Sequence, residues 1–254
     1  MPTLCSVRIS DLYEDGRFCC CLPDPKLRAA LEACVPPSVA VELIPGNHDR
    51  REHLSDLSSS GSSAGRVRLP GCPGKAAFAS LEECGWLVIG CDSLVEGSGH
   101  GELGAAQLSW LRETLDAHPA APVVLFMHHP PLPHLELGWA PGFTKQAGLL
   151  FSDADRLALE SLFQGRAGQQ VKAICVGHVH AEFDVPLAGV PVLGTPSSWV
   201  QHNIDPITAK EPADRVAYED IPPGWRLIRL TGSTVEDGRV DSAVVRVGET
   251  TARL

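Results

Sequence analysis

Apolar residues in this chain occur in two kinds of run, one of strand length and one with helical spacing. Short and nearly continuous apolar runs predict buried strands. These runs cover residues 39–44, 77–81, 85–90, 123–127, 171–176 and 190–193. Near-alternation of apolar and polar residues at 222–230 and 242–247 predicts a closing antiparallel hairpin.

Two longer segments, residues 105–117 and 153–164, place their apolar residues on one helical face. Strands that alternate with helices are typical of an α/β fold. Ser and Gly dominate residues 55–75, so we expect a surface loop there. Neither an internal repeat nor an interdomain linker interrupts the pattern, so residues 1–254 are predicted to form a single domain.

Composition and charge narrow the classes of function. A hydrophobic fraction of 44% is ordinary for a globular core, and a net charge of −10 argues against a nucleic-acid surface. We expect neither a membrane span, which needs roughly 18 consecutive apolar residues, nor a secretory signal peptide. The nine cysteines are scattered without the spacing of a disulfide framework. A reducing, cytoplasmic location is therefore expected.

Residues that can bind metals follow three of the predicted strands. The motifs are Gly46-Asn47-His48-Asp49, His128-His129-Pro130-Pro131 and Gly177-His178-Val179-His180. Loops at the carboxyl ends of strands commonly hold ligands and acid/base groups. Converging imidazoles with an amide and a carboxylate suit a divalent transition metal such as Zn, Mn or Fe rather than Ca or Mg.

The local geometry of two motifs can also be predicted. Gly46 is expected to allow a sharp backbone turn, which Asp49 would support. His178 and His180 are two residues apart, so both can point to one side of an extended segment.

These motifs resemble those of the calcineurin-like metallophosphoesterases. In chain order that superfamily carries Asp-x-His, Gly-Asp-x-x-Asp, Gly-Asn-His-Asp/Glu, a His before x-Pro, and Gly-His-x-His, and the last three are intact here. Further segments are similar to the class III cyclic-nucleotide phosphodiesterases: Cys91-Asp92-Ser93, Gly101-Glu102-Leu103, Gln107-Leu108-Ser109-Trp110-Leu111 and Pro223-Gly224-Trp225-Arg226. The resemblance covers nearly the whole chain. It implies an α/β fold in which helices flank a two-sheet β-sandwich, with metals at the carboxyl ends of central strands.

The amino-terminal motifs depart from the family pattern. Asp11 can begin Asp-x-His with Tyr13 in place of His, or it can be the first Asp of Gly-Asp-x-x-Asp with Ser10 and Glu14 as replacements. Asp11 precedes Asn47 by 36 residues, which accommodates one strand–helix–strand unit of roughly 30 residues but not two. The family has one such unit at this point in the second alignment, so we assign Asp11 to the metal-bridging position. The strand that carries Asp-x-His is then expected to be missing, because the start of the chain is truncated or divergent.

The resemblance implies two sites for divalent transition metals, Fe, Mn or Zn. One site takes Asp11, Asn47, His128 and His178, and all four residues are present. The other retains Asp11 and His180 of its ligands. Catalytic sites usually have three protein ligands, so this second ion is expected to bind weakly or not at all.

The resemblance also implies catalytic roles. A metal-bound hydroxide attacks phosphorus, and the metals stabilise charge on the phosphoryl oxygens. His48 is expected to be the general acid for the leaving alkoxide, and Glu14 the carboxylate that orients it. Substrate contacts are assigned to Asn47, His48 and His180, with Trp199 as a candidate for stacking on a base.

The expected activity is hydrolysis of a small-molecule phosphodiester, a 3',5'-cyclic nucleotide such as cyclic AMP. A glycerophosphodiesterase or a broad-specificity phosphoesterase is the alternative, because the same motifs serve those enzymes. A hypothesis of another class follows from the missing Asp-x-His strand: a catalytically impaired remnant that binds metal or nucleotide. We expect no nucleic-acid polymer as a partner, and a homodimer is compatible with the resemblance.

Overall fold

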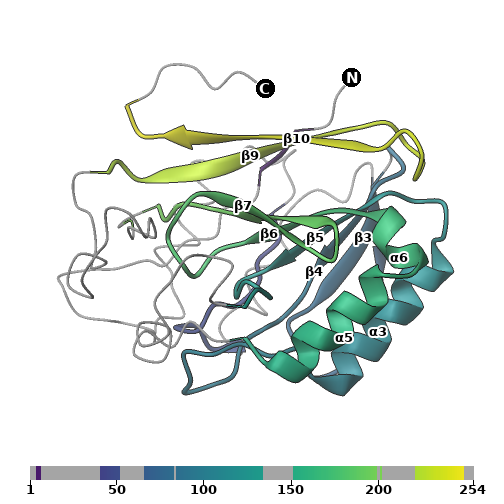
Figure 1. The fold of residues 1–254 in the computed structure, drawn as a ribbon, viewed down its shortest axis with the longest axis horizontal. Helices are drawn as coiled ribbons and strands as arrows, with labels where there is room; N and C mark the ends of the chain where they lie inside the picture. The colour runs from purple at the N-terminus through teal and green to yellow at the C-terminus, as the bar shows by residue number, and fades with distance from the viewer. Residues whose placement is uncertain are drawn as a thin grey trace.

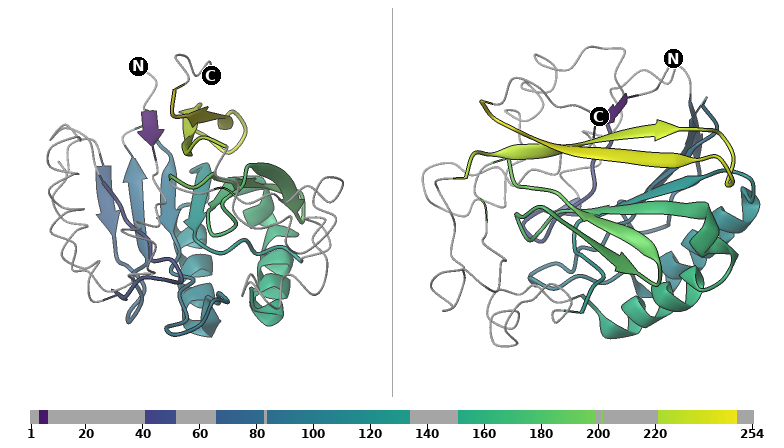
Figure 2. Two further views of the ribbon diagram at one scale, coloured as in Figure 1. Left: turned by 90° about the vertical axis from the view of Figure 1, so that its left-hand side faces the viewer. Right: turned by 45° about the horizontal axis from the view of Figure 1, so that its top comes forward.

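The strands form two sheets that pack against each other. A computed structural model describes residues 4–6, 41–51, 66–82, 84–133, 151–198, 201 and 221–248. Within them, one sheet has seven strands in the order β2-β3-β4-β5-β6-β8-β7, and the other has three in the order β1-β9-β10. The smaller sheet lies over one face of the larger, and the helices lie on the opposite face (Figures 1 and 2).

The larger sheet is parallel in its centre and antiparallel at its edges. Its strands are β2 (Arg66–Leu69), β3 (Phe78–Glu82), β4 (Leu87–Gly90), β5 (Val123–Met127), β6 (Val171–Val176), β7 (Phe183–Leu187) and β8 (Val190–Gly194). Strands β4, β5, β6 and β8 run parallel, whereas β3 and β7 are antiparallel to their neighbours. Because parallel strands end at the same edge of a sheet, the loops after β5 and β6 lie next to each other.

The smaller sheet and the helices complete the layers. The sheet consists of β1 (Leu4–Ser6), β9 (Gly224–Thr231) and β10 (Arg239–Arg246), with β9 antiparallel to both neighbours. The helices are α3 (Gly104–Ala117), α5 (Asp153–Phe163) and α6 (Arg166–Gln170).

The central strands are buried on both faces, and each face belongs to a different hydrophobic core. On the helix side, strand residues pack with residues of α3 and α5; this core includes Leu87, Ile89, Val123, Leu125, Ile174, Leu111, Leu115, Leu159 and Phe163. On the other side, alternate residues pack with β9; this core includes Trp86, Val88, Val124, Phe126, Cys175, Ile228 and Leu230. Burial on both faces explains why these strands read as continuous apolar runs.

Most elements predicted from the apolar pattern are confirmed. Strands β5 and β6 have the predicted bounds, and α3 and α5 begin and end within one residue of them. The strand pair β3–β4, strand β8 and the antiparallel hairpin β9–β10 also occur where they were expected. The predicted α/β class, with two packed sheets and flanking helices, is likewise confirmed.

Two predictions about secondary structure are wrong. Residues 41–44, the described part of the strand predicted at 39–44, belong to no strand. Ile44 instead packs against the core beneath β9, and Glu42 forms an ion pair with Arg68 of β2, so side-chain contacts rather than a ladder hold this run. Residues 66–69 of the predicted Ser/Gly loop form β2, because their alternating Arg, Val, Arg and Leu pair along β3. Residues 55–65 of that loop lie outside the described residues.

The two longer helices are joined at their amino termini. The Asp155 carboxylate of α5 accepts hydrogen bonds from the backbone N–H groups of Leu103, at 2.6 Å, and Gly104, at 2.9 Å. A carboxylate at this position satisfies free N–H groups and complements the helix dipole of α3. The loop between β4 and α3 is therefore fixed at the end where it joins α3.

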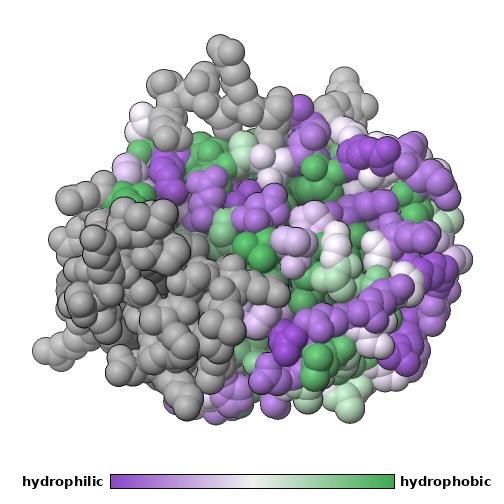
Figure 3. All heavy atoms as spheres, viewed as in Figure 1, coloured by the Kyte–Doolittle hydropathy of each residue, from purple (hydrophilic) through white to green (hydrophobic). Residues whose placement is uncertain are grey.

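The helices direct polar side chains outward, as amphipathic segments do. Hydrophilic residues gather over the helices in the face shown in Figure 3. Arg156 of α5 forms ion pairs with Asp153 and Glu160 of the same helix. In the part of the chain that the structure describes, no helix combines the length and apolarity needed to cross a membrane.

Replacing Trp86 tests the core between the sheets. Trp86 is fully buried, and its indole N–H donates to the Gly232 carbonyl at 3.0 Å. Trp86→Phe is expected to lower the free energy of unfolding by about 1–3 kcal/mol, because it leaves a cavity and an unpaired carbonyl. Trp110→Phe is the control: its indole N–H donates to the Pro70 carbonyl at 3.0 Å in an exposed bond. Because Trp110 is only partly buried against the helix-side core, the loss of unfolding free energy should stay below about 1 kcal/mol. Urea unfolding measures both, and equal losses would contradict the assignment of Trp86 to this core.

Candidate metal centre

Three side chains from distant parts of the chain meet at the carboxyl ends of β5 and β6. The Asn47 Oδ1 atom lies 2.9 Å from His128 Nε2 and 3.1 Å from His178 Nδ1. The two imidazole nitrogens are 3.1 Å apart. An amide oxygen and a neutral imidazole nitrogen each offer a lone pair, so the three atoms form a triangle of candidate ligand atoms.

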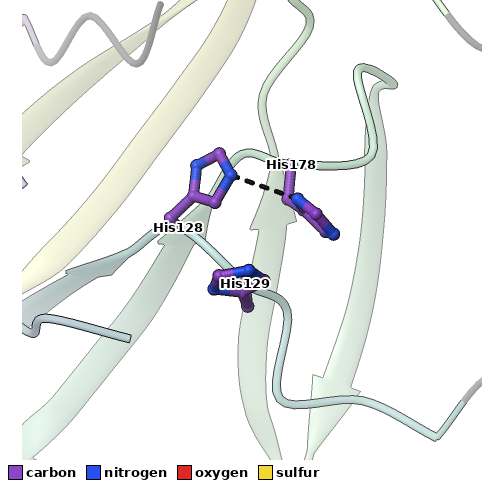
Figure 4. Close-up of side chains that lie close together, drawn as sticks. All are labelled: His128, His129 and His178. Carbon is purple, nitrogen blue, oxygen red and sulfur yellow. Dashed lines mark hydrogen bonds between the residues drawn. The ribbon is translucent and has the colours of Figure 1, made fainter. Parts of the chain in front are cut away.

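The dimensions of this triangle fit a divalent transition metal. Ligand atoms about 2.1 Å from an ion are about 3.0 Å apart when they lie at right angles, and about 3.4 Å apart in a tetrahedron. The observed edges of 2.9 and 3.1 Å match the first arrangement. His128, His129 and His178 are also buried, with ligand atoms within 4.8 Å of one another (Figure 4). The cluster could therefore hold a metal ion.

The loop after β5 carries two of the histidines. His128 and His129 follow Met127, the last residue of the strand, and both side chains are buried. The His128 carbonyl accepts a hydrogen bond from the Gly177 N–H at 3.0 Å, which joins this loop to the loop after β6. The imidazole of His129 packs on that of His178, with 4.4 Å between ring centroids.

The loop after β6 holds His178 in an unusual backbone conformation. His178 and His180 have φ angles of 64° and 50°, which residues other than glycine rarely adopt. The Val179 N–H donates to the Gly177 carbonyl at 2.7 Å, closing a γ-turn around His178. The prediction that the two histidines share one side of an extended segment is therefore wrong, because both have a positive φ angle and a γ-turn surrounds His178.

The turn that carries Asn47 is closed by Asp49. The Gly46 N–H donates to the Asp49 carboxylate at 2.7 Å, and the Asp49 N–H donates to the Gly46 carbonyl at 3.1 Å. The predicted support by Asp49 is thus confirmed. Gly46 itself does not have a left-handed backbone. Glycine is required there for a different reason: a Cβ atom would lie 2.9 Å from the His128 ring.

An ion pair connects this turn to the loop that follows β4. The Arg51 guanidinium donates to both carboxylate oxygens of Asp92, at 2.5 and 3.0 Å, and also to the Leu94 carbonyl. Asp92 is fully buried, whereas the Arg51 side chain is 25% exposed. The hydrogen bond to Asp92 raises the pKa of Arg51 above its ordinary value, although burial opposes the change.

Ser93, the next residue, connects the loop after β4 to the loop after β5 through hydrogen bonds. Its hydroxyl lies 2.8 Å from His129 Nδ1 and accepts a hydrogen bond from the His129 N–H at 3.2 Å. On the other side, a Cβ atom on Gly101 would lie 2.4 Å from the His129 ring. The ring of His129 is therefore held between Ser93 and the backbone of Gly101.

The residues predicted for the site have different outcomes. Asn47, His128 and His178 come together as expected. His48 is half-buried in the turn next to Asn47, and His180 is buried but lies outside the three-histidine cluster. The remaining candidates, Asp11, Glu14 and Trp199, lie outside the described residues, and their roles stay predictions.

Arg51 and Asp92 were not among the residues predicted for the site. Asp92 belongs to Cys91-Asp92-Ser93, a segment that is similar to the class III cyclic-nucleotide phosphodiesterases, whereas Arg51 lies just after the Gly46–Asp49 motif. A carboxylate two residues after a buried strand is a further signal in the sequence. Its partner, 41 residues away, could not be read from the chain.

Comparison with known proteins gives consistent matches. The family model for calcineurin-like phosphoesterases matches residues 11–182. A 3',5'-cyclic adenosine monophosphate phosphodiesterase, CpdA, from Escherichia coli K12 is 30% identical over 209 residues, which are 82% of this chain and 63% of the relative. The CpdA of Haemophilus influenzae is 29% identical over 217 residues, 85% of this chain and 67% of the relative. A cAMP/cGMP dual specificity phosphodiesterase from Mycobacterium tuberculosis is 33% identical over 153 residues, 58% of this chain and 40% of the relative.

A solved structure of a dimetal phosphatase from Danio rerio is 17% identical and covers 86% of this chain and 74% of that chain, with a TM-score of 0.48. The chain spans 63% of the length of the Escherichia coli relative. The matched residues 11–182 make up more than half of the chain and include Asn47, His128 and His178. The chain belongs to the calcineurin-like phosphoesterase family.

Proposed function

We propose that the protein is a metal-dependent phosphodiesterase that hydrolyses 3',5'-cyclic nucleotides, with cyclic AMP as the preferred substrate. The observation that carries the proposal is the triangle of Asn47 Oδ1, His128 Nε2 and His178 Nδ1. The substrate class is supported by relatives named as cyclic AMP phosphodiesterases, which match most of this chain.

Asn47, His128 and His178 would hold one divalent transition metal, Fe, Mn or Zn, with Asp11 as the predicted fourth ligand. Asp11 and His180 are the predicted ligands of a second ion. When bound, such ions lower the pKa of water and offset negative charge on phosphoryl oxygens. The net charge of −10 is no obstacle to an anionic substrate, because a bound cation sets the local charge.

The residues around the triangle would position the substrate and move a proton. His48 lies on the turn that Asp49 closes, next to Asn47. In the proposed reaction its imidazole donates a proton to the leaving 3' oxygen, so that a cyclic nucleotide yields a 5'-monophosphate. The predicted contacts of Glu14 with His48 and of Trp199 with the base complete this proposal.

The substrate assignment is tested by comparing three phosphoesters under the same conditions. With Mn²⁺ present, kcat/KM is expected to be highest for cyclic AMP, lower for glycerophosphocholine and lowest for p-nitrophenyl phosphate. A higher value for glycerophosphocholine would overturn the cyclic-nucleotide assignment and favour a glycerophosphodiesterase. Similar values for all three would favour a broad-specificity phosphoesterase.

Asn47→Ala and His178→Ala test the ligand triangle. Mutating a residue that only orients a metal ligand typically lowers metal affinity or activity about 10–100-fold. Removing a ligand itself is therefore expected to reduce Mn²⁺-dependent hydrolysis by more than about 100-fold. His118→Ala, at the carboxyl end of α3, is the control and should keep wild-type activity. Circular dichroism checks that each variant is folded, and near-wild-type turnover by folded Asn47→Ala would refute the assignment.

Metal removal tests whether the chain is an enzyme or an impaired remnant. Dialysis against a chelator is expected to abolish hydrolysis and lower the melting temperature, because bound metal stabilises the folded state by about 2.7 kcal/mol at 100 times its Kd. Added Mn²⁺, Fe²⁺ or Zn²⁺ should restore both. Elemental analysis of the reconstituted protein counts the bound ions: two per chain support an enzyme, and a folded chain with one or none that does not hydrolyse cyclic AMP supports the remnant.

A further inference from the structure

Asn47 is held differently from the two histidines of the triangle. His128 and His178 follow adjacent parallel strands, and a Gly177 to His128 backbone hydrogen bond joins their loops. Residues 41–44, which lead to the Asn47 turn, belong to no strand. The sheet therefore does not set the position of Asn47 in the way it sets the positions of His128 and His178.

Arg51, four residues after Asn47, supplies an attachment. Its Nε and Nη2 atoms donate to the two carboxylate oxygens of Asp92, and Nη2 also donates to the Leu94 carbonyl. Two parallel bonds from a planar guanidinium fix orientation as well as distance. The contact spans 41 residues of sequence, and it joins the Asn47 turn to the loop after β4.

Asp92 is a rigid base for this attachment. Its carboxylate also accepts hydrogen bonds from the backbone N–H groups of Ala76, at 2.8 Å, and Leu94, at 2.9 Å. Gln107 of α3, itself buried, accepts from the Asp92 N–H and donates to the Asp92 carbonyl, both at 2.8 Å. A fully buried carboxylate needs a cation nearby, so burial makes the pairing with Arg51 strongly favoured.

The neighbouring residue connects the same loop to the histidines. Ser93 contacts both the ring and the backbone N–H of His129, directly after His128. Asp92 and Ser93 thus contact the two chain segments that carry Asn47 and His128.

From these contacts we infer that Arg51 and Asp92 are positioning residues of the metal centre. Their ion pair sets Asn47 Oδ1 at ligand distance from His128 Nε2 and His178 Nδ1. The inference rests on the proposed function, since it names the residues that assemble the same site. Arg51 and Asp92 act through the turn, because their side chains make polar contacts to each other, to Glu96 and to neighbouring backbone groups.

Arg51→Gln and Arg51→Lys test the inference by calorimetric titration of the chelator-treated full chain with Mn²⁺. Arg51→Gln removes the positive charge and the two parallel hydrogen bonds to Asp92, and the Kd for Mn²⁺ is expected to rise about 10–100-fold. Arg51→Lys keeps the charge but loses the two-point contact, so its Kd should lie in between. Arg156→Gln removes two ion pairs within α5 and should leave the Kd unchanged.

A double-mutant cycle separates positioning from general destabilisation. If Arg51 acts by placing Asn47, Arg51→Gln should cause no further loss of Mn²⁺ affinity in an Asn47→Ala background. Independent, additive losses would overturn the inference. Urea unfolding verifies that each protein is folded during titration. If Arg51→Gln does not fold, the cycle is repeated with Arg51→Lys, which leaves Asp92 with a cationic partner.

The wild-type titration distinguishes failure of this inference from failure of the proposed function. Wild-type protein that neither binds Mn²⁺ nor hydrolyses cyclic AMP would contradict the proposed function. Wild-type protein that binds Mn²⁺, together with a folded Arg51→Gln variant of equal affinity, would overturn the positioning role alone.

Discussion

The candidate site depends on the parallel pairing of β5 with β6. Met127 pairs with Val176, so the two strands end together, and their next residues emerge at one edge of the sheet. A shift of one residue along this ladder would turn each following side chain to the opposite face. Two cores hold the register, because β5 and β6 bury alternate residues against the helices and against β9.

The packed sheet also stabilises the strained turn at His178. Hydrogen bonds continue past the ends of the strands, from Gly177 to His128 and from Thr195 to Val176, at 3.0 and 2.8 Å. Backbone conformations of this kind persist where the surroundings determine them, and they occur frequently at functional sites. The energy stored at His178 is thus offset by the ladder on both sides of it.

Asn47 joins this arrangement through polar contacts. The turn closed by Asp49, the approach of Gly46 to the His128 ring and the ion pair of Arg51 with Asp92 together determine where its side chain lies. One part of the candidate site therefore follows from strand pairing, and another from a buried charge pair. The second part is more sensitive to single substitutions, because an unpaired buried carboxylate is costly.

The sequence by itself determined the strands β5 and β6, the helices α3 and α5, and the residues Asn47, His128 and His178. Burial on both faces leaves continuous apolar runs in the chain, helical amphipathicity leaves a periodic pattern, and the motifs name the residues that are predicted to be ligands. The tertiary structure alone decided the γ-turn at His178, the edge strand β2 and the attachment of Asn47 through Arg51 to Asp92. Such features depend on contacts between residues far apart in the chain, and local periodicity carries no information about which distant partner a side chain meets.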